Sequence, residues 1–329
     1  MQIKTDGMAN ITVKFVNFWN GFNESANRFV ELLRTRHNVT IIPSTDPAEP
    51  DLLFFSIFGT PRHFGSRSIR IYYTGENDVP DFNVCDYAIS FHPITFSDRH
   101  FRYPLYMLYN PYGVEGASCA LSDDMATDRG FCTALLRNTQ SCDPVRISII
   151  DTVESYKPIT YGGPFRNNTG GPVADKIEFI SGYKFNLALE NSCVPGYVTE
   201  KIVEPFAAGT VPVYWGSEWV NNDFNPSAFI NASNHASPVD LVKAISDIDN
   251  DSSRYLEMLN APKFRPGVPG KYDEGLLEFL DNIVVNGRRH VSPYGMSGTI
   301  YAIDSLTRPA YHSVWTRRAL KLLKKLSVI

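Results

Sequence analysis

The sequence contains no long run of apolar residues, and its N-terminal segment lacks the apolar core of a secretory signal peptide. A helix that crosses a bilayer needs about 20 consecutive apolar residues, so the sequence predicts no transmembrane segment. Asn-x-Ser/Thr triplets occur, for example at Asn10 and Asn38. Without a secretory signal they are expected to be chance matches, unless the chain is a trimmed part of a luminal protein.

An excess of positive charge is also absent. The chain has 31 Lys and Arg residues against 35 Asp and Glu residues, a formal net charge of −4. Nucleic-acid binding relies on a strong basic field. We therefore exclude nucleic acid as a partner, and any site for an anion must be local.

Cysteine is scarce and follows no ligand spacing. The five cysteines are Cys85, Cys119, Cys132, Cys142 and Cys193. Their odd number, and the lack of any CxxC or Cys/His pattern, argue against a disulfide framework and against a structural zinc site. Reduced thiols in a cytoplasm fit this usage best.

A chain of 329 residues with 43% hydrophobic content is long enough for two cores. Short apolar runs that read as strands lie at 11–16, 39–42, 52–58, 69–73 and 87–91, with a helical stretch near 26–34. Such alternation favours a parallel, Rossmann-like sheet.

The segment 111–130 is rich in Pro and Gly and then acidic, which predicts a connection between domains. The expected domains are an N-terminal Rossmann-like domain over 1–125, a second Rossmann-like domain over 126–304, and a basic amphipathic helix over 305–329. In that last helix, Trp315 and several leucines share one face and the Arg and Lys residues lie largely opposite. It fits equally well peripheral contact with an anionic membrane or packing across the domain junction.

The most informative segment is 183–216, which reads as strand, loop, helix and strand. An apolar run stops at Glu190, Thr199 can cap a helix, and Gly209 closes that helix before a second β-rich run. This order is that of a βαβ unit in a parallel sheet, where ligands bind beyond the carboxyl ends of the strands.

The predicted helix points its free N–H groups and its positive dipole end at that edge, and Lys201 adds a full charge in its first turn. A lysine is unfavourable there unless a bound anion, or Glu200 beside it, compensates. The pattern predicts a phosphate site. The alternative is a solvated Glu-Lys pair on a surface helix.

This segment closely resembles the donor-binding motif of the alpha-1,3/4-fucosyltransferases of glycosyltransferase family ten. The matching elements are Tyr183-Lys184-Phe185, Glu190-Asn191, Tyr197-Val198-Thr199-Glu200-Lys201 and Gly209-Thr210-Val211-Pro212-Val213. Weaker matches lie at 13–19, at 72–77, at 131–132 and at Arg146. The resemblance thus spans most of residues 11–235, and it implies a GT-B fold, in which two Rossmann-like domains face each other across a cleft.

The resemblance also implies roles for individual residues. Glu76, in the turn after a predicted strand, would be the general base. Arg146 and Lys201 would hold the diphosphate, which suits the planar fork of a guanidinium. Glu200 would meet the fucose ring and stabilise positive charge at the anomeric carbon. The remaining candidates are Asn191 and Tyr197 as donor contacts, and Glu190 as a structural or ribose-binding carboxylate.

The predicted activity is inverting transfer of L-fucose from GDP-beta-L-fucose to the 3-hydroxyl of GlcNAc or Glc in a lactosamine-type oligosaccharide. The alternatives are a GT-B transferase for another nucleotide sugar and a non-catalytic carbohydrate-binding protein. No Asp-x-Asp metal signature is evident between the domains, so we expect chemistry without a cofactor or a required divalent metal. We expect a cytoplasmic, membrane-peripheral location, or else the soluble part of a Golgi enzyme.

Two further groups of residues are candidates for contact with the acceptor or the donor. The aromatic residues Phe18, Trp19, Phe22 and Phe58 lie near predicted strand ends, where they could stack on a sugar or pack in the core. The glycine-rich loop 162–171 could cover the donor through Arg166, although it matches no phosphate-binding fingerprint and a flexible surface loop is the default.

Overall fold

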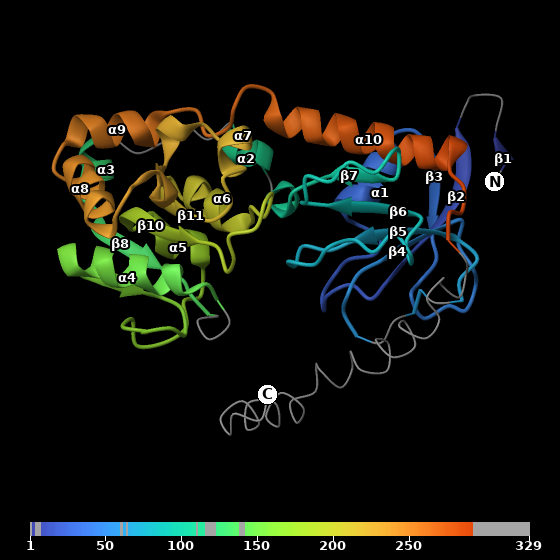
Figure 1. Cartoon of the computed structure of the whole chain (residues 1–329), viewed down its shortest axis with the longest axis horizontal. Helices are drawn as coiled ribbons and strands as arrows, with labels where there is room; N and C mark the ends of the chain where they lie inside the picture. The colour runs from blue at the N-terminus through green and yellow to red at the C-terminus, as the bar shows by residue number, and fades with distance from the viewer. Residues whose placement is uncertain are drawn as a thin grey trace, which may run out of the picture. The chain divides into compact units, whose positions relative to one another are not determined.

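The computed structural model describes residues 2–3, 8–59, 62–63, 65–109, 111–115, 123–137 and 142–291. The chain divides into two compact units, each described here by itself (Figure 1). The first unit holds residues up to Ser90, Ile94–Phe101 and residues from Gly275 onward. The second unit holds Phe91–Pro93 and Arg102–Glu274.

The first unit is built on one sheet of seven strands. Its strands are β1 (Gln2–Ile3), β2 (Ala9–Val16), β3 (Asn38–Ile41), β4 (Leu52–Phe55), β5 (Ile69–Tyr73), β6 (Tyr87–Ser90) and β7 (His100–Arg102). Strand β2 lies between β3 and β4, and β5 and β6 follow in order; these neighbours all pair in parallel. Strand β1 pairs antiparallel with the start of β2.

The second unit contains a sheet of five parallel strands in the order β12-β11-β10-β8-β9. These strands are β8 (Gly130–Ala134), β9 (Ile159–Tyr161), β10 (Tyr183–Leu189), β11 (Val211–Trp215) and β12 (Ile230–Asn231). Strands β10 and β11 read as almost continuous buried apolar runs, as expected for a parallel sheet covered on both faces.

Helices complete both units. They are α1 (Arg28–Arg34), α2 (Pro111–Glu115), α3 (Asp123–Thr127), α4 (Pro144–Tyr156), α5 (Lys176–Ser181), α6 (Glu200–Ala207), α7 (Val220–Asp223), α8 (Pro238–Asp249), α9 (Ser252–Asn260) and α10 (Val268–Asn286), with short 3-10 turns at Leu105–Leu108, Pro226–Ala228 and Ala232–Asn234.

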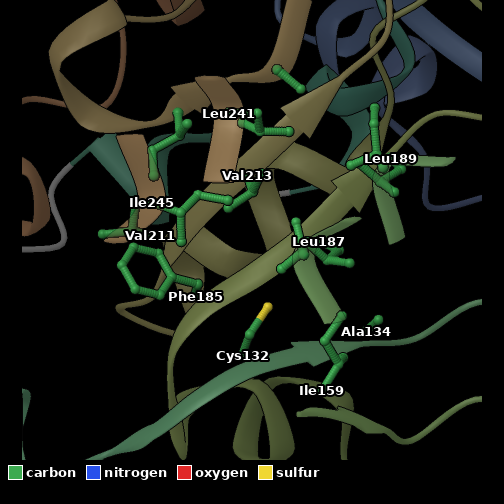
Figure 2. Packing of buried hydrophobic residues seen from close by; sticks show 14 of the residues in the cluster. Cys132, Ala134, Ile159, Phe185, Leu187, Leu189, Val211, Val213, Leu241 and Ile245 are labelled. Atoms are coloured by element: carbon green, nitrogen blue, oxygen red, sulfur yellow. The ribbon is translucent and has the colours of Figure 1, made fainter. Parts of the chain in front are cut away.

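The core of the second unit shows how its sheet is covered. Alternate residues of β10 and β11, among them Phe185, Leu187 and Val213, pack against Leu241 and Ile245 of α8 (Figure 2). Helices α4 and α9 contribute to the same cluster. Helices α5 and α6 contact these strands but supply no residue to it, so they cover the opposite face. The fold is therefore a doubly wound α/β sheet, as predicted.

Most predicted elements are confirmed, and one expectation needs correction. The segment 111–130 is not merely a connection, because α2, α3 and the start of β8 form within its described residues. Pro111 begins α2 because proline suits the first turn of a helix, where no N–H is needed. The main part of the compact second unit runs from Arg102 to Glu274, and the domain bounds 1–125 and 126–304 stay a prediction. The predicted helix over 305–329 lies outside the described residues.

Candidate active site

Sheet topology marks one place in the second unit where a ligand fits. Strand β8 comes first in the chain, and the next two strands, β9 and β10, lie on opposite sides of it. The loops that leave β8 and β10 therefore diverge to opposite faces, and ligands of open α/β sheets bind where this happens. The loop after β8 leads to Arg146, and the loop after β10 begins at Glu190.

Glu190 is the buried anchor of this place. Its side chain is fully buried, and its carboxylate accepts hydrogen bonds from the Thr199 backbone N–H at 2.8 Å and the Thr199 hydroxyl at 2.8 Å. The Lys201 ammonium lies 3.2 Å from the same carboxylate. Burial raises the pKa of Glu190, and Lys201 opposes that rise. With every donor internal, Glu190 holds the start of α6 in place, which favours the structural one of its two predicted roles.

Helix α6 begins as predicted. Thr199 is the N-cap, and its hydroxyl accepts from the Lys201 backbone N–H. The Lys201 ammonium sits between two carboxylates, with Glu200 at 3.3 Å and Glu190 on its other side. Burial alone would lower the pKa of Lys201, but Glu190 and Glu200 outweigh it and hold the pKa above its ordinary value. Lysine in the first turn is thus compensated by carboxylates of the chain itself.

The Glu200–Lys201 pair is not a solvated surface pair. The side chains of Glu200 and Lys201 are only 19% and 21% exposed. Each therefore keeps a small solvent-accessible surface and is otherwise enclosed by protein. Burial raises the pKa of the Glu200 carboxyl, but Lys201 more than offsets this, and the pKa lies below its ordinary value. Glu200 is therefore a carboxylate that stays ionised beside a cation.

Arg146 joins the same place from the other loop. It lies in the first turn of α4, whose N-cap is Asp143, and its Nη1 donates to the Asn191 side-chain oxygen at 2.9 Å. The Asn191 backbone carbonyl accepts from the Asp143 N–H at 3.0 Å. Burial lowers the pKa of the Arg146 guanidinium, which still remains charged. The structure thus brings the predicted residues Arg146 and Asn191 to the edge where Glu190 and Lys201 lie.

The loop between Glu190 and Thr199, which we call the donor loop (residues 191–198), is held by a hydrogen bond from its backbone and takes a conformation at Gly196 that favours glycine. Gly196 has φ +83°, a conformation that L side chains rarely adopt. Its N–H donates to the Ser217 hydroxyl at 2.9 Å, and the same hydroxyl accepts from the Trp219 N–H. Tyr197 follows with only 5% exposure. Sequence reasoning missed Ser217, although a serine directly after a strand-ending Gly216 could have drawn attention to a side-chain-capped turn.

Gly216 is required for a different reason. A Cβ at this position would lie 2.6 Å from the Glu190 Cγ and 2.6 Å from the Tyr214 hydroxyl oxygen. The chain directly after β11 therefore approaches the buried Glu190 side chain more closely than a residue with a Cβ would permit. This contact fixes Glu190, and through it Lys201.

Glu76 belongs to the first unit. It follows β5 by three residues, its side chain is exposed, and its backbone N–H donates to the Thr74 hydroxyl at 3.2 Å. The side chain is thus presented on a short turn beyond the carboxyl end of a parallel strand, as predicted. Its role as general base stays a prediction.

The first unit has a pocket at its own switch point. Strand β2 comes first among the parallel strands there, and β3 and β4 lie on either side of it. A pocket of about 310 Å³ lies beyond their carboxyl ends, lined by Phe15, Val16, Asn17, Phe18, Trp19, Phe22, Glu24, Ser44, Phe58, Gly59 and Arg62. The rings of Phe18, Trp19, Phe22 and Phe58 are half-buried and in mutual contact.

The backbone of this pocket is held in an uncommon conformation. Asn17 has φ 60°, which asparagine tolerates better than most residues. Its side chain donates to the Phe58 carbonyl at 2.7 Å and accepts from the Arg62 N–H at 2.8 Å. Asn17 thus ties the loop after β2 to the loop after β4.

Two other candidates, Lys184 and Arg166, fall outside the site. Lys184 starts β10 and pairs with Asp249 at 2.8 Å, so within the matched motif it is a structural residue. Arg166 pairs with Asp151 and Glu154 of α4, which holds the glycine-rich loop against that helix.

Among the described residues, no group of three or more His, Cys, Asp or Glu side chains could hold a metal ion. No described helix is long and apolar enough to cross a bilayer.

Two family models match the chain. The model "Alpha-(1,3)-fucosyltransferase FucT N-terminal domain" covers residues 13–109, and "Glycosyltransferase family 10 (fucosyltransferase) C-term" covers residues 131–263. The Helicobacter pylori alpha-(1,3)-fucosyltransferase FucT is 33% identical over 76% of this chain and 59% of the relative. Human FUT6, a 4-galactosyl-N-acetylglucosaminide 3-alpha-L-fucosyltransferase, is 40% identical over 34% of this chain and 31% of the relative. The chain thus spans less than two thirds of these relatives.

Solved structures agree with these matches. A crystal structure of an alpha1,3-fucosyltransferase with GDP-fucose superposes with a TM-score of 0.72 at 27% identity, covering 89% of this chain and 95% of that one. A further crystal structure of an alpha1,3-fucosyltransferase gives a TM-score of 0.75 at 27% identity over the same shares.

The fold and the site define a GT-B-type α/β protein with two parallel sheets, one of which gathers two cations at its switch point. With both family models matched along it, the chain belongs to glycosyltransferase family 10, the fucosyltransferases.

Proposed function

We propose that this protein transfers L-fucose from GDP-beta-L-fucose to the 3-hydroxyl of GlcNAc or Glc in a lactosamine-type oligosaccharide, with inversion at the anomeric carbon. The observation that carries the proposal is the meeting of Arg146 and Lys201 at the switch point of the second sheet, in a chain of the fucosyltransferase family. The named relatives and the structure with GDP-fucose support this choice of donor and reaction.

The cations would hold the leaving diphosphate. A phosphate that approaches the N-terminus of α6 would meet the positive end of the helix dipole and the accessible face of Lys201. Arg146 adds a planar donor group that matches phosphate oxygens. These groups do the work that a divalent ion does in other transferases, so we propose that the chemistry requires no metal.

Glu200 would act on the sugar. It is ionised, largely shielded from water, and adjacent to the cation that would hold the phosphate. A carboxylate in such a position stabilises the positive charge that grows at the anomeric carbon as the bond to phosphate breaks. Asn191 and Tyr197, on the same donor loop, would complete the contacts with the nucleotide sugar.

Glu76 would take the proton from the acceptor hydroxyl. Its exposure on a turn beyond β5 fits a base that must reach an incoming sugar. Because the donor site lies in the second unit and Glu76 in the first, loss of this carboxylate should not weaken nucleotide binding.

The aromatic pocket of the first unit would receive the acceptor. The half-buried rings of Trp19 and Phe22 offer apolar faces on which a sugar ring can stack, while Glu24 and Arg62 offer polar contacts to its hydroxyls. The pocket lies beyond the carboxyl ends of parallel strands, on the side of the sheet to which the Glu76 turn also belongs.

A nucleotide-sugar panel tests the proposal. The protein is incubated with GDP-fucose, GDP-mannose, UDP-galactose or UDP-GlcNAc in the presence of N-acetyllactosamine, and nucleotide release is measured. We expect release of GDP from GDP-fucose only, and an alpha-linked product at the 3-hydroxyl by NMR. Turnover with a UDP sugar would favour the alternative transferase, and acceptor binding without any nucleotide release would favour a non-catalytic carbohydrate-binding protein.

A further inference from the structure

A three-residue segment packs directly against the donor loop. Phe91–Pro93 follows β6 and belongs to the second unit, although the chain on either side of it belongs to the first. A Cβ on Gly196 would lie 2.2 Å from the Phe91 carbonyl oxygen and 3.1 Å from Pro93 Cδ. The donor loop therefore rests on the Phe91 carbonyl with no space between them.

The same segment contacts a predicted donor residue. The ring of Phe91 lies edge-on to the ring of Tyr197, with centroids 4.9 Å apart. Both side chains are buried, at 1% and 5% exposure. The position of Tyr197 thus depends on that of Phe91.

Arg102 holds Phe91 in position. Its Nε donates to the Phe91 carbonyl at 3.1 Å, and its Nη2 pairs with Asp223 of α7 at 3.0 Å. The guanidinium also lies over the Trp219 ring, 4.8 Å from its centroid. The side chains of Arg102 and Asp223 are only 13% and 4% exposed, so water screens this pair little.

The contacts close into a ring around the donor loop. Asp223 accepts a second hydrogen bond from the Tyr272 hydroxyl at 2.8 Å, which orients the carboxylate. Trp219, whose ring lies under Arg102, donates its backbone N–H to the Ser217 hydroxyl. The same hydroxyl accepts the hydrogen bond from the Gly196 N–H. Arg102 is therefore connected to Gly196 both through Phe91 and through Trp219.

We infer that Arg102 is a positioning residue for the donor loop: through the Phe91 carbonyl and the Trp219 ring it fixes Gly196 and Tyr197 in the conformation that binds the nucleotide sugar. This inference rests on the proposed function for its ligand, but not for the loop geometry itself. Arg102 touches no substrate and acts only through these neighbours.

The first test replaces the guanidinium. In Arg102→Gln the Phe91 carbonyl and Asp223 both lose this partner, and we expect the Kd for GDP by calorimetry to rise about tenfold, the equivalent of one charge-assisted hydrogen bond. The donor KM should rise similarly, with the acceptor KM unchanged. Arg265→Gln is the matched control, because Arg265 donates to the Asn221 carbonyl of the same helix but reaches neither Phe91 nor the donor loop. Arg102→Lys keeps the positive charge but not the planar guanidinium. Its Tm should therefore lie near the wild-type value, while its GDP affinity should stay as low as that of Arg102→Gln.

A second variant does not depend on Arg102. Gly196→Ala must push the donor loop off the Phe91 carbonyl, and it also strains the backbone. Gly267→Ala is its control, since Gly267 has φ +73° and an added methyl group there would have no heavy atom within 4 Å. Both variants carry the backbone penalty, so we expect only Gly196→Ala to weaken GDP binding, by about tenfold or more.

Hydrogen–deuterium exchange separates the inference from the proposed function. The amides of Gly196, Tyr197 and Val198 are hydrogen-bonded in the ligand-free chain. They should exchange faster in Arg102→Gln than in wild type or in Arg265→Gln. Wild-type exchange at these amides in Arg102→Gln would overturn the inference, as would equal GDP affinity. Wild-type protein that binds no GDP, combined with faster exchange in the variant, would overturn the proposed function and leave the positioning role standing.

Discussion

The two sheets share one strand order and differ in what they place at the switch point. In each, the first parallel strand lies between the second and the third, β2 between β3 and β4 and β8 between β9 and β10. In the second unit, Arg146, Lys201 and Glu200 gather there around the buried Glu190 carboxylate. In the first unit, aromatic rings surround a pocket of about 310 Å³.

This difference indicates that the strand order sets where each candidate site lies, and that the side chains there determine which kind of ligand fits. Charges that are shielded from water suit a diphosphate, whereas aromatic faces suit an uncharged sugar ring. On the proposed function the donor would bind at one sheet and the acceptor at the other, and four substitutions can break or sharpen this division.

The largest effect is expected from Glu76→Gln. Removal of a general base lowers kcat by about 10²–10⁴-fold, while the Kd for GDP should stay at its wild-type value because the donor site is in the other unit. Steady-state kinetics and calorimetry measure the two. Asp78→Asn, in the same turn with its carboxylate held by the Tyr72 hydroxyl, is the control and should keep most activity. A parallel loss of GDP binding in Glu76→Gln would end the assignment of this carboxylate to the acceptor side.

Lys201→Ala should weaken GDP binding by about 10- to 100-fold, because charge-assisted hydrogen bonds to phosphate are lost. The variant also leaves Glu190 buried without its cation, so Tm should fall. Lys243→Ala, which removes an exposed lysine paired with Asp247, should change neither. If calorimetry found wild-type affinity in Lys201→Ala, the diphosphate would have to lie elsewhere.

Trp19→Ala tests the aromatic side of the comparison. We expect the acceptor KM to rise about tenfold from the loss of one stacking face, with the donor KM unchanged. Phe96→Ala is the control, since Phe96 is an exposed aromatic residue of the first unit outside the pocket. An effect on the donor KM alone would contradict the division between the two sheets.

The smallest effect on activity is expected from Asp249→Asn. Burial alone would raise the pKa of Asp249, but hydrogen bonds from Lys157 and Lys184 outweigh it and lower the pKa. A lowered pKa means that the carboxylate stabilises the fold above its unfolded-state pKa and loses this contribution as the pH falls through the lower folded-state value. Wild type should therefore lose its advantage over the variant in acid, at constant GDP affinity. Denaturation midpoints at pH 7 and below pH 4 measure this, and an altered GDP affinity would place Lys184 in the donor site after all.

The candidate site of the second unit was largely predictable because most of its residues lie close together in the sequence. Glu190, Thr199 and Lys201 lie within one βαβ unit, so capping rules and strand ends alone bring them together. Arg146 lies about 45 positions away and was predicted by resemblance, since no local rule pairs it with Asn191.

Other features could not be read from local patterns. The pair of Arg102 and Asp223 spans 121 positions, and neither residue stands in a recognisable motif. The packing of Leu105–Leu108 and of α2 on α6 could not be read from local patterns either, because these contacts join segments that lie far apart in the sequence. The sequence alone also could not tell which lysine of the motif is available to a ligand. Lys184 and Lys201 occur in the same motif, but Lys201 keeps the larger accessible surface, while Lys184 is paired with Asp249.

The late arrival of α10 has a consequence for synthesis of the chain. Arg36 and His37, beside β3, pair with Asp281 at 3.2 and 2.8 Å, and Asp86 accepts the backbone N–H groups of His290 and Val291. Residues that are translated early thus pair with residues up to 245 positions further along the chain, which are translated later. On the ribosome the second unit can therefore close first, whereas Tyr87 of β6 and Phe101 of β7 gain their contacts with Phe279 only once α10 has emerged.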